Sequence, residues 1–78
     1  MLDRSKYPRM LKKGEVLSNV LNLSDTIMVA RDVVLNDWKQ SFGVINTSGE
    51  YGSRIGSFWE DASPEAIIDF HLRSKGVL

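Results

Sequence analysis

The second half of the chain constrains the fold most, because residues 42–76 contain a hairpin signal followed directly by a capped helix. An apolar run ends at Ile45, the polar tetrad Asn46–Gly49 follows, and a strand pattern resumes at Tyr51. Gly49 supplies the positive φ that closes a type I turn with a bulge, and the Asn46 side chain can accept a hydrogen bond from the backbone two residues on. We therefore predict an antiparallel hairpin here.

The returning strand shows the period of two that is typical of a half-buried strand. Tyr51, Ile55 and Trp59 share one face, and Phe58 is the one large apolar residue on the other face. If the strand continues through residues 58 and 59, these adjacent aromatic side chains point to opposite faces. One of them is therefore expected at the surface, where an exposed aromatic residue is a common anchor of protein interfaces.

A helix over about residues 63–75 is expected next, because capping signals bound it at both ends. Ser63 offers an N-cap hydroxyl, and Pro64 stands at the first helical position, where a missing N–H costs nothing. Lys75 lies at the negative end of the helix dipole, and Gly76 can adopt the left-handed conformation that ends a helix.

The residues of this helix that lie outside its charged stripe spread over roughly 240° of a helical wheel. Because one face of a sheet cannot cover so wide an arc, either the first half of the chain wraps the helix or a partner covers it. The arc holds Ala66, Ile67, Ile68, Phe70, His71 and Leu72, and the polar stripe holds Glu65, Asp69 and Arg73.

Residues 15–41 allow two interpretations, of which the first is a pair of strands. Segments 15–23 and 26–35 would be separated by the turn 22–25, with Asn36 and Asp37 forming a two-residue hairpin turn into the next strand. The chain would then be an α+β domain, an antiparallel β-meander of three to four strands with the C-terminal helix packed on it. One face of its second strand would carry Ile27, Val29, Val33 and Leu35.

The second interpretation is a long helix from Ser24, as N-cap, to Ser41, with Gly43 just after its end. Residues 17–24 would then resemble the first helix and turn of a helix-turn-helix, with the left-handed-tolerant Asn22 at the turn. The hairpin 43–59 would be the wing of a winged helix. This version is also α+β.

The totals describe a small globular protein. At 78 residues with 42% hydrophobic and 26% charged residues, the chain matches one ordinary folded domain. With no cysteine it has no disulfide framework, which favours a reducing environment. No apolar run approaches the roughly 18 residues of a membrane span, and the polar N-terminus lacks a signal-peptide pattern, so a cytoplasmic location is expected.

Positive charge gathers at the N-terminus of a chain whose net charge is zero. We expect residues 1–9 to form a loosely ordered basic arm and residues 10–78 to form the globular domain. Such an arm can be a solvated tail or can bind phosphate or an acidic partner. The first 15 residues hold Arg4, Lys6, Arg9, Lys12 and Lys13 against Asp3 and Glu15.

Catalytic or metal-binding constellations are missing from the pattern. His71, the single histidine, has no carboxylate three or four residues away on its helix, so it is expected to be a packed or boundary residue. Without a usable histidine, no serine gains an activating base. Gly49, Gly52 and Gly56 lie within a strand pattern, so they favour a bulge or a close backbone approach over a phosphate loop. We expect no enzyme activity, cofactor or metal.

The leading hypothesis is therefore a small non-catalytic protein that binds another protein, or a second copy of itself, through its hairpin and helix. Accessory subunits, adaptors and compact inhibitors such as phage-encoded antagonists all fit this pattern. The candidate contact residues are Tyr51, Arg54, Phe58 and Trp59.

The alternative hypothesis is a winged-helix DNA-binding regulator, in which cations contact phosphates. The candidate residues are Arg4, Lys6 and Arg9 on the arm, Arg31 and Lys39 on the second helix, and Arg54 on the wing.

Overall fold

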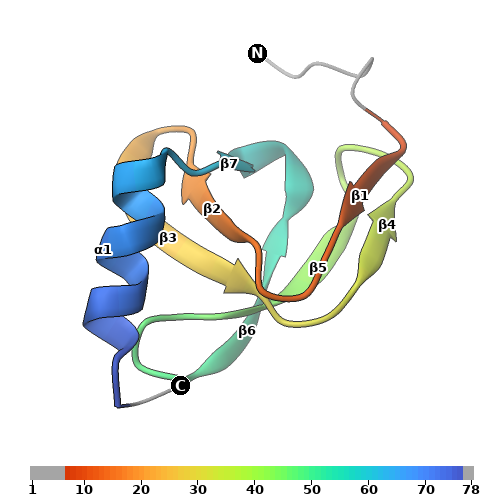
Figure 1. Ribbon diagram of the computed structural model, residues 1–78. Coiled ribbons are helices and arrows are strands. Elements are labelled where there is room, and N and C mark those ends of the chain that lie inside the picture. Colours follow the sequence, from red (N-terminus) through yellow and green to blue (C-terminus); the bar gives the residue numbers. More distant parts are fainter. Residues whose placement is uncertain (1–6, 77–78) are drawn as a thin grey trace.

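A computed structural model describes residues 7–76 of the chain (Figure 1). Seven strands, one 3₁₀ turn and one α-helix follow one another within these residues. In order they are β1 (Arg9–Leu11), β2 (Val16–Asn19), β3 (Asn22–Val29), β4 (Val33–Leu35), β5 (Ser41–Ile45), β6 (Tyr51–Ile55), the 3₁₀ helix η2 (Gly56–Phe58), β7 (Trp59–Asp61) and α1 (Pro64–Ser74).

The strands form a five-stranded antiparallel sheet in the order β6-β5-β3-β2-β7 and a two-stranded sheet of β1 and β4. The edge strands β6 and β7 are joined by η2 alone. The four residue steps from Ile55 to Trp59 span at most about 14 Å, whereas a flat five-stranded sheet separates its edges by about 19 Å. The large sheet must therefore curl until its two edges approach each other.

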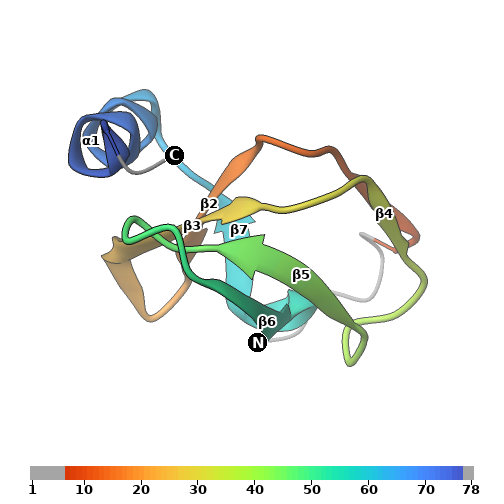
Figure 2. The ribbon, with the colours of Figure 1, turned by 90° about the horizontal axis from the view of Figure 1, so that it is seen from below.

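The inside of the curled sheet holds the main core. Alternate residues of the central strands point inward, and β1 and β4 close one end by contributing Leu11 and Leu35. Figure 1 and Figure 2 place these two short strands at the opposite end of the molecule from α1. The buried cluster consists of Leu11, Leu17, Ile27, Val29, Leu35, Phe42, Val44 and Trp59.

A second, smaller packing layer lies on the outer face of the sheet. Val16 pairs with Met28 and Met28 pairs with Ile45, so these three side chains share the face opposite to Leu17. Helix α1 contacts β2 and β3 and buries Phe70 and Ser74. Figure 2 shows the helix set to one side of these strands.

The local signals of the second half are confirmed. In the β5–β6 turn the N–H of Gly49 donates to the Asn46 carbonyl at 3.0 Å, Gly49 has a φ of 80°, and the Asn46 Oδ1 accepts from the Ser48 N–H at 2.9 Å. At the start of α1, the Ser63 Oγ accepts from the Ala66 N–H at 3.2 Å. Gly76 follows the helix with a φ of 85°.

Of the two interpretations of residues 15–41, the structure contains strands. The long helix from Ser24 to Ser41 is absent, and with it the winged-helix arrangement, because β3 occupies residues 22–29 and β4 residues 33–35. Ile27, Val29 and Leu35 are buried in the core, as the strand pattern predicted. Arg31, which the helix interpretation placed on the second helix, lies exposed at a bend between the strands.

The strand interpretation was wrong in two connections. The first turn is at residues 20–21 instead of 22–25, because the Asn19 Oδ1 accepts from the Leu21 N–H at 2.8 Å and closes an Asx turn there. Asn36 and Asp37 do not form a two-residue hairpin turn, because β4 pairs with β1 and not with β5. A longer loop follows β4, in which the Asp37 Oδ1 accepts from the N–H groups of Lys39 and Gln40.

Residues 7–9 of the expected basic arm lie within the described structure. Tyr7 packs against the core, and Arg9, which was expected in the basic arm, belongs to β1. The arm residues Arg4 and Lys6 lie outside the described residues.

Gly56 has a packing reason to be glycine, because it begins η2 against the core. A Cβ built at this position would lie 2.6 Å from the Leu35 Cδ1 and 3.5 Å from the Gln40 carbonyl oxygen. Leu35 is fully buried, so its side chain cannot move aside freely. The close contact at this glycine is therefore with a side chain, whereas a close approach of another backbone was expected.

Replacing Gly56 with alanine should therefore lower the free energy of unfolding by about 1–3 kcal/mol through overpacking. Urea unfolding followed by circular dichroism would measure this loss. Gly52→Ala is the matched control in β6, because its Cβ would lie 3.3 Å from the end of the long Arg54 side chain instead of 2.6 Å from a fully buried one. An equal loss in both variants would contradict a specific clash at position 56.

Candidate protein-binding surface

Phe58 stands at the surface on a backbone that is held from two sides. The N–H groups of Gly56 and Ser57 donate to the carbonyls of Gln40 and Trp38, at 3.0 and 3.2 Å. From the other side, the N–H of Val20 donates to the Phe58 carbonyl at 2.9 Å. The Phe58 side chain is nevertheless 47% exposed. An aromatic ring is thus presented to solvent by a short turn that is tied to two different loops.

Trp59 points the other way and belongs to the core, with 4% of its surface exposed. The prediction that one of the two adjacent aromatic residues would be exposed is therefore confirmed, with Phe58 outside. The Arg54 guanidinium carbon lies 5.8 Å from the Trp59 ring centroid, in cation–π geometry. Trp59 and the half-buried Arg54 thus form a layer beneath the surface.

The Trp59 main chain is also anchored. Arg9 Nη1 donates to the Trp59 carbonyl at 2.7 Å, and Arg9 Nη2 lies 3.6 Å from Asp61 Oδ1. In addition, β7 pairs with β2, which sets Trp59 opposite Asn19. These contacts hold the end of η2, and so the position of Phe58, relative to the sheet.

Tyr51 and Ile55 are exposed on the outer face of the edge strand β6, by 78% and 39%. The expectation that Trp59 would share their face was wrong. The strand ends at Ile55, and the 3₁₀ turn that follows changes the direction of the chain, which breaks the period of two. The turn therefore separates two exposed side chains of β6 from the buried Trp59.

Two apolar residues that sequence reasoning missed stand next to Phe58. Val20 and Leu21 form the tip of the β2–β3 turn and are 41% and 84% exposed. The hydrogen bond from Val20 to the Phe58 carbonyl brings this tip beside η2. The available signal was an apolar pair between Asn19 and Asn22, since a tight turn leaves its central side chains in solvent. We call Val20, Leu21, Ile55 and Phe58 the η2 surface; Tyr51 begins β6, at the end of that strand far from η2, and is not part of it.

The cations of the DNA-binding alternative do not share one helix. Arg9 is engaged with β7, and Arg31 is exposed after β3. Lys39 lies in the β4–β5 loop, where its Nζ is 5.4 Å from the Trp38 ring centroid. Arg54 lies over Trp59 from β6. The second helix that was to carry Arg31 and Lys39 together is absent from the described chain.

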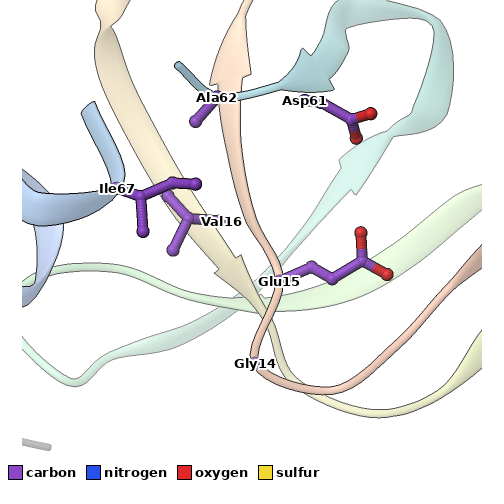
Figure 3. Close-up of a pocket in the computed structure, with 6 residues that line it drawn as sticks. All are labelled: Gly14, Glu15, Val16, Asp61, Ala62 and Ile67. Carbon is purple, nitrogen blue, oxygen red and sulfur yellow. The ribbon is translucent and has the colours of Figure 1, made fainter. Parts of the chain in front are cut away.

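A shallow hollow of about 220 Å³ lies between β2 and the start of α1 (Figure 3). Val16, Ala62 and Ile67 form its apolar side, and the carboxylates of Glu15 and Asp61 point away from that side. Glu15 Oε1 accepts from the Lys12 N–H at 2.7 Å, and Asp61 approaches Arg9. Both carboxylates therefore already have partners within the protein.

His71 is exposed on α1 and meets Phe70 edge-on, with ring centroids 5.8 Å apart. The histidine that was expected to be packed or at a boundary is thus an exposed residue that keeps a ring contact with Phe70. Among residues 7–76, no three side chains of the kinds that ligate metals gather in one place. None of the helices within this range is both long and apolar enough to cross a membrane.

Comparisons with known proteins found no match for this chain. The sequence matches no protein-family model, no curated protein and no solved structure.

Proposed function

We propose that this chain is a small non-catalytic protein that acts by binding another protein, and that the η2 surface is the contact site. The observation that carries the proposal is the exposure of Phe58 on a turn that hydrogen bonds hold from two sides. Large aromatic residues contribute much of the binding energy of protein interfaces when a partner covers them. Phe58 is the aromatic centre of this surface.

Preorganisation supports the same site. A flexible loop loses conformational entropy when it binds, and that loss reduces affinity. The η2 turn is already ordered by contacts with Gln40, Trp38 and Val20, so Phe58 can be buried without ordering its backbone. Because β6 is an edge strand, Ile55 extends the apolar area along an accessible border of the sheet.

The surface also has the composition of a contact site. Arg54 lies over the Trp59 ring and can extend polar contacts without leaving it. Val20 and Leu21 add aliphatic side chains on the other side of Phe58. Accessory subunits, adaptors and inhibitors are the classes that use such compact surfaces.

The test is affinity capture from the native host, with the wild-type chain and the variant Phe58→Ala as immobilised baits. We expect proteins captured by the wild type to be enriched at least about ten-fold less by the variant, because loss of a central anchor costs about 2 kcal/mol or more. Purified partners would then be titrated against both baits by calorimetry.

Met10→Ala is the matched control, since Met10 is 69% exposed on β1, in the other sheet. It should capture the same proteins as the wild type. Equal capture by the wild type and Phe58→Ala, or no protein retained above the bare matrix, would refute the proposed site. Unfolding curves should show that Phe58→Ala stays folded, because the side chain is half-exposed.

A further inference from the structure

Helix α1 carries a second apolar stripe that the η2 surface does not use. Ile68 and Leu72 are 60% and 67% exposed, and four residues separate them, so they are neighbours on one side of the helix. Each lies two residues from the buried Phe70, or about 160° around the helix from it. The stripe therefore faces directly away from the sheet that α1 covers.

The charges on this stripe are arranged symmetrically about Phe70. Glu65 lies three residues before Ile68, and Lys75 lies three residues after Leu72, so all four exposed side chains fall within about 80° of the wheel. The order along the stripe is acid, apolar, apolar, base. Reversing the direction of the helix therefore exchanges acid with base and leaves apolar opposite apolar.

We propose that α1 pairs with α1 of a second copy of this chain, antiparallel, about a two-fold axis at the level of Phe70. A position before Phe70 in one copy then lies opposite the position that is equally far after Phe70 in the other copy. Ile68 lies beside Leu72 of the second copy, and Glu65 lies beside Lys75 of the second copy. An isologous interface requires this kind of self-complementary patch, because the same surface is used twice.

Charge complementarity also determines the direction of pairing. A parallel pair would bring Glu65 beside Glu65 of the second copy and Lys75 beside Lys75 of the second copy, and both contacts are repulsive. The antiparallel pair makes two attractive contacts instead, and it opposes the two helix dipoles. The neighbouring Asp69 and Arg73 already form an ion pair at 2.9 Å within their own helix. They therefore flank the contact as a neutral unit.

The same pattern favours a second copy over an unrelated protein. A foreign partner would need complementary charges, but it would not require the stripe of this chain to be symmetric about its own midpoint. One helix from each copy makes an interface at the small end of the usual range, so the dimer should be weak. The expected dissociation constant of the dimer is therefore between about 1 µM and about 1 mM.

Sedimentation equilibrium of the full 78-residue chain over this concentration range tests the pairing. The wild type should shift from monomer to dimer, and Leu72→Glu should weaken dimerisation at least ten-fold. Met10→Glu is the control, because Met10 is 69% exposed but lies on β1, in the other sheet. It should dimerise like the wild type. Circular dichroism would verify that each variant keeps its helix.

A charge exchange tests the direction. Glu65→Lys and Lys75→Glu should each weaken dimerisation, and the double variant should restore it, because each pair then has opposite signs again. A wild type that stays monomeric up to about 1 mM, or single variants that the exchange fails to rescue, would overturn the proposal. The inference does not rest on the proposed function. Phe58→Ala should dimerise normally, so the two proposals fail separately.

Discussion

Trp59→Ala should lower the free energy of unfolding by about 3–5 kcal/mol, one of the two largest losses expected from a single truncation among the described residues. The indole is 4% exposed within the main core, so its removal leaves a cavity that the neighbouring strands cannot fill. It also takes away the ring on which Arg54 lies. Because a small domain has a net stability of roughly 5–15 kcal/mol, much of the total would be lost.

Urea unfolding followed by far-ultraviolet circular dichroism would measure this loss, since the variant lacks one of the two tryptophans that fluorescence would report. Trp38→Ala is the natural comparison, because Trp38 is half-buried in the β4–β5 loop. The free energy of unfolding should fall clearly less in Trp38→Ala than in Trp59→Ala. If the two variants were equally destabilised, Trp59 would not be the principal tryptophan of the core.

Phe70→Ala should lower the free energy of unfolding by a similar amount, about 3–5 kcal/mol, for a different reason. Phe70 is fully buried, yet it lies outside the main core cluster, between α1 and the outer face of the sheet. It is the one large apolar side chain that α1 buries. Its truncation should therefore destabilise the packing of the helix more than that of the curled sheet. The short helix would not persist alone, since isolated helices of this length are marginal in water.

Hydrogen exchange would distinguish this local loss from global unfolding. In Phe70→Ala, amides of α1 should lose protection to a greater extent than amides of the β5–β6 hairpin. Leu72→Ala, on the same helix but 67% exposed, should change stability by less than about 1 kcal/mol. Uniform loss of protection across the helix and the hairpin would show that α1 and the sheet unfold as one unit.

The features that could be predicted from the sequence are those specified by neighbouring residues. The Asn46–Gly49 turn depends on a side chain and a glycine three residues apart, and the limits of α1 depend on Ser63 and Gly76. One of the adjacent residues Phe58 and Trp59 was expected at the surface and one is, although Phe58 ends a 3₁₀ turn instead of continuing a strand. For the candidate site, this meant that an exposed aromatic residue was predictable, whereas its neighbours Val20 and Leu21 were not.

The tertiary structure decided which distant segments meet. The period of two in residues 26–35 is compatible with any antiparallel partner, so it could not show that β4 pairs with β1 or that β7 crosses to β2. Those pairings curl the sheet and set Val20 beside Phe58. They also determine that the sheet covers Phe70 and leaves Ile68 and Leu72 in solvent. Turns and caps depend on residues close in sequence, whereas strand partners and exposed faces depend on how the whole chain packs.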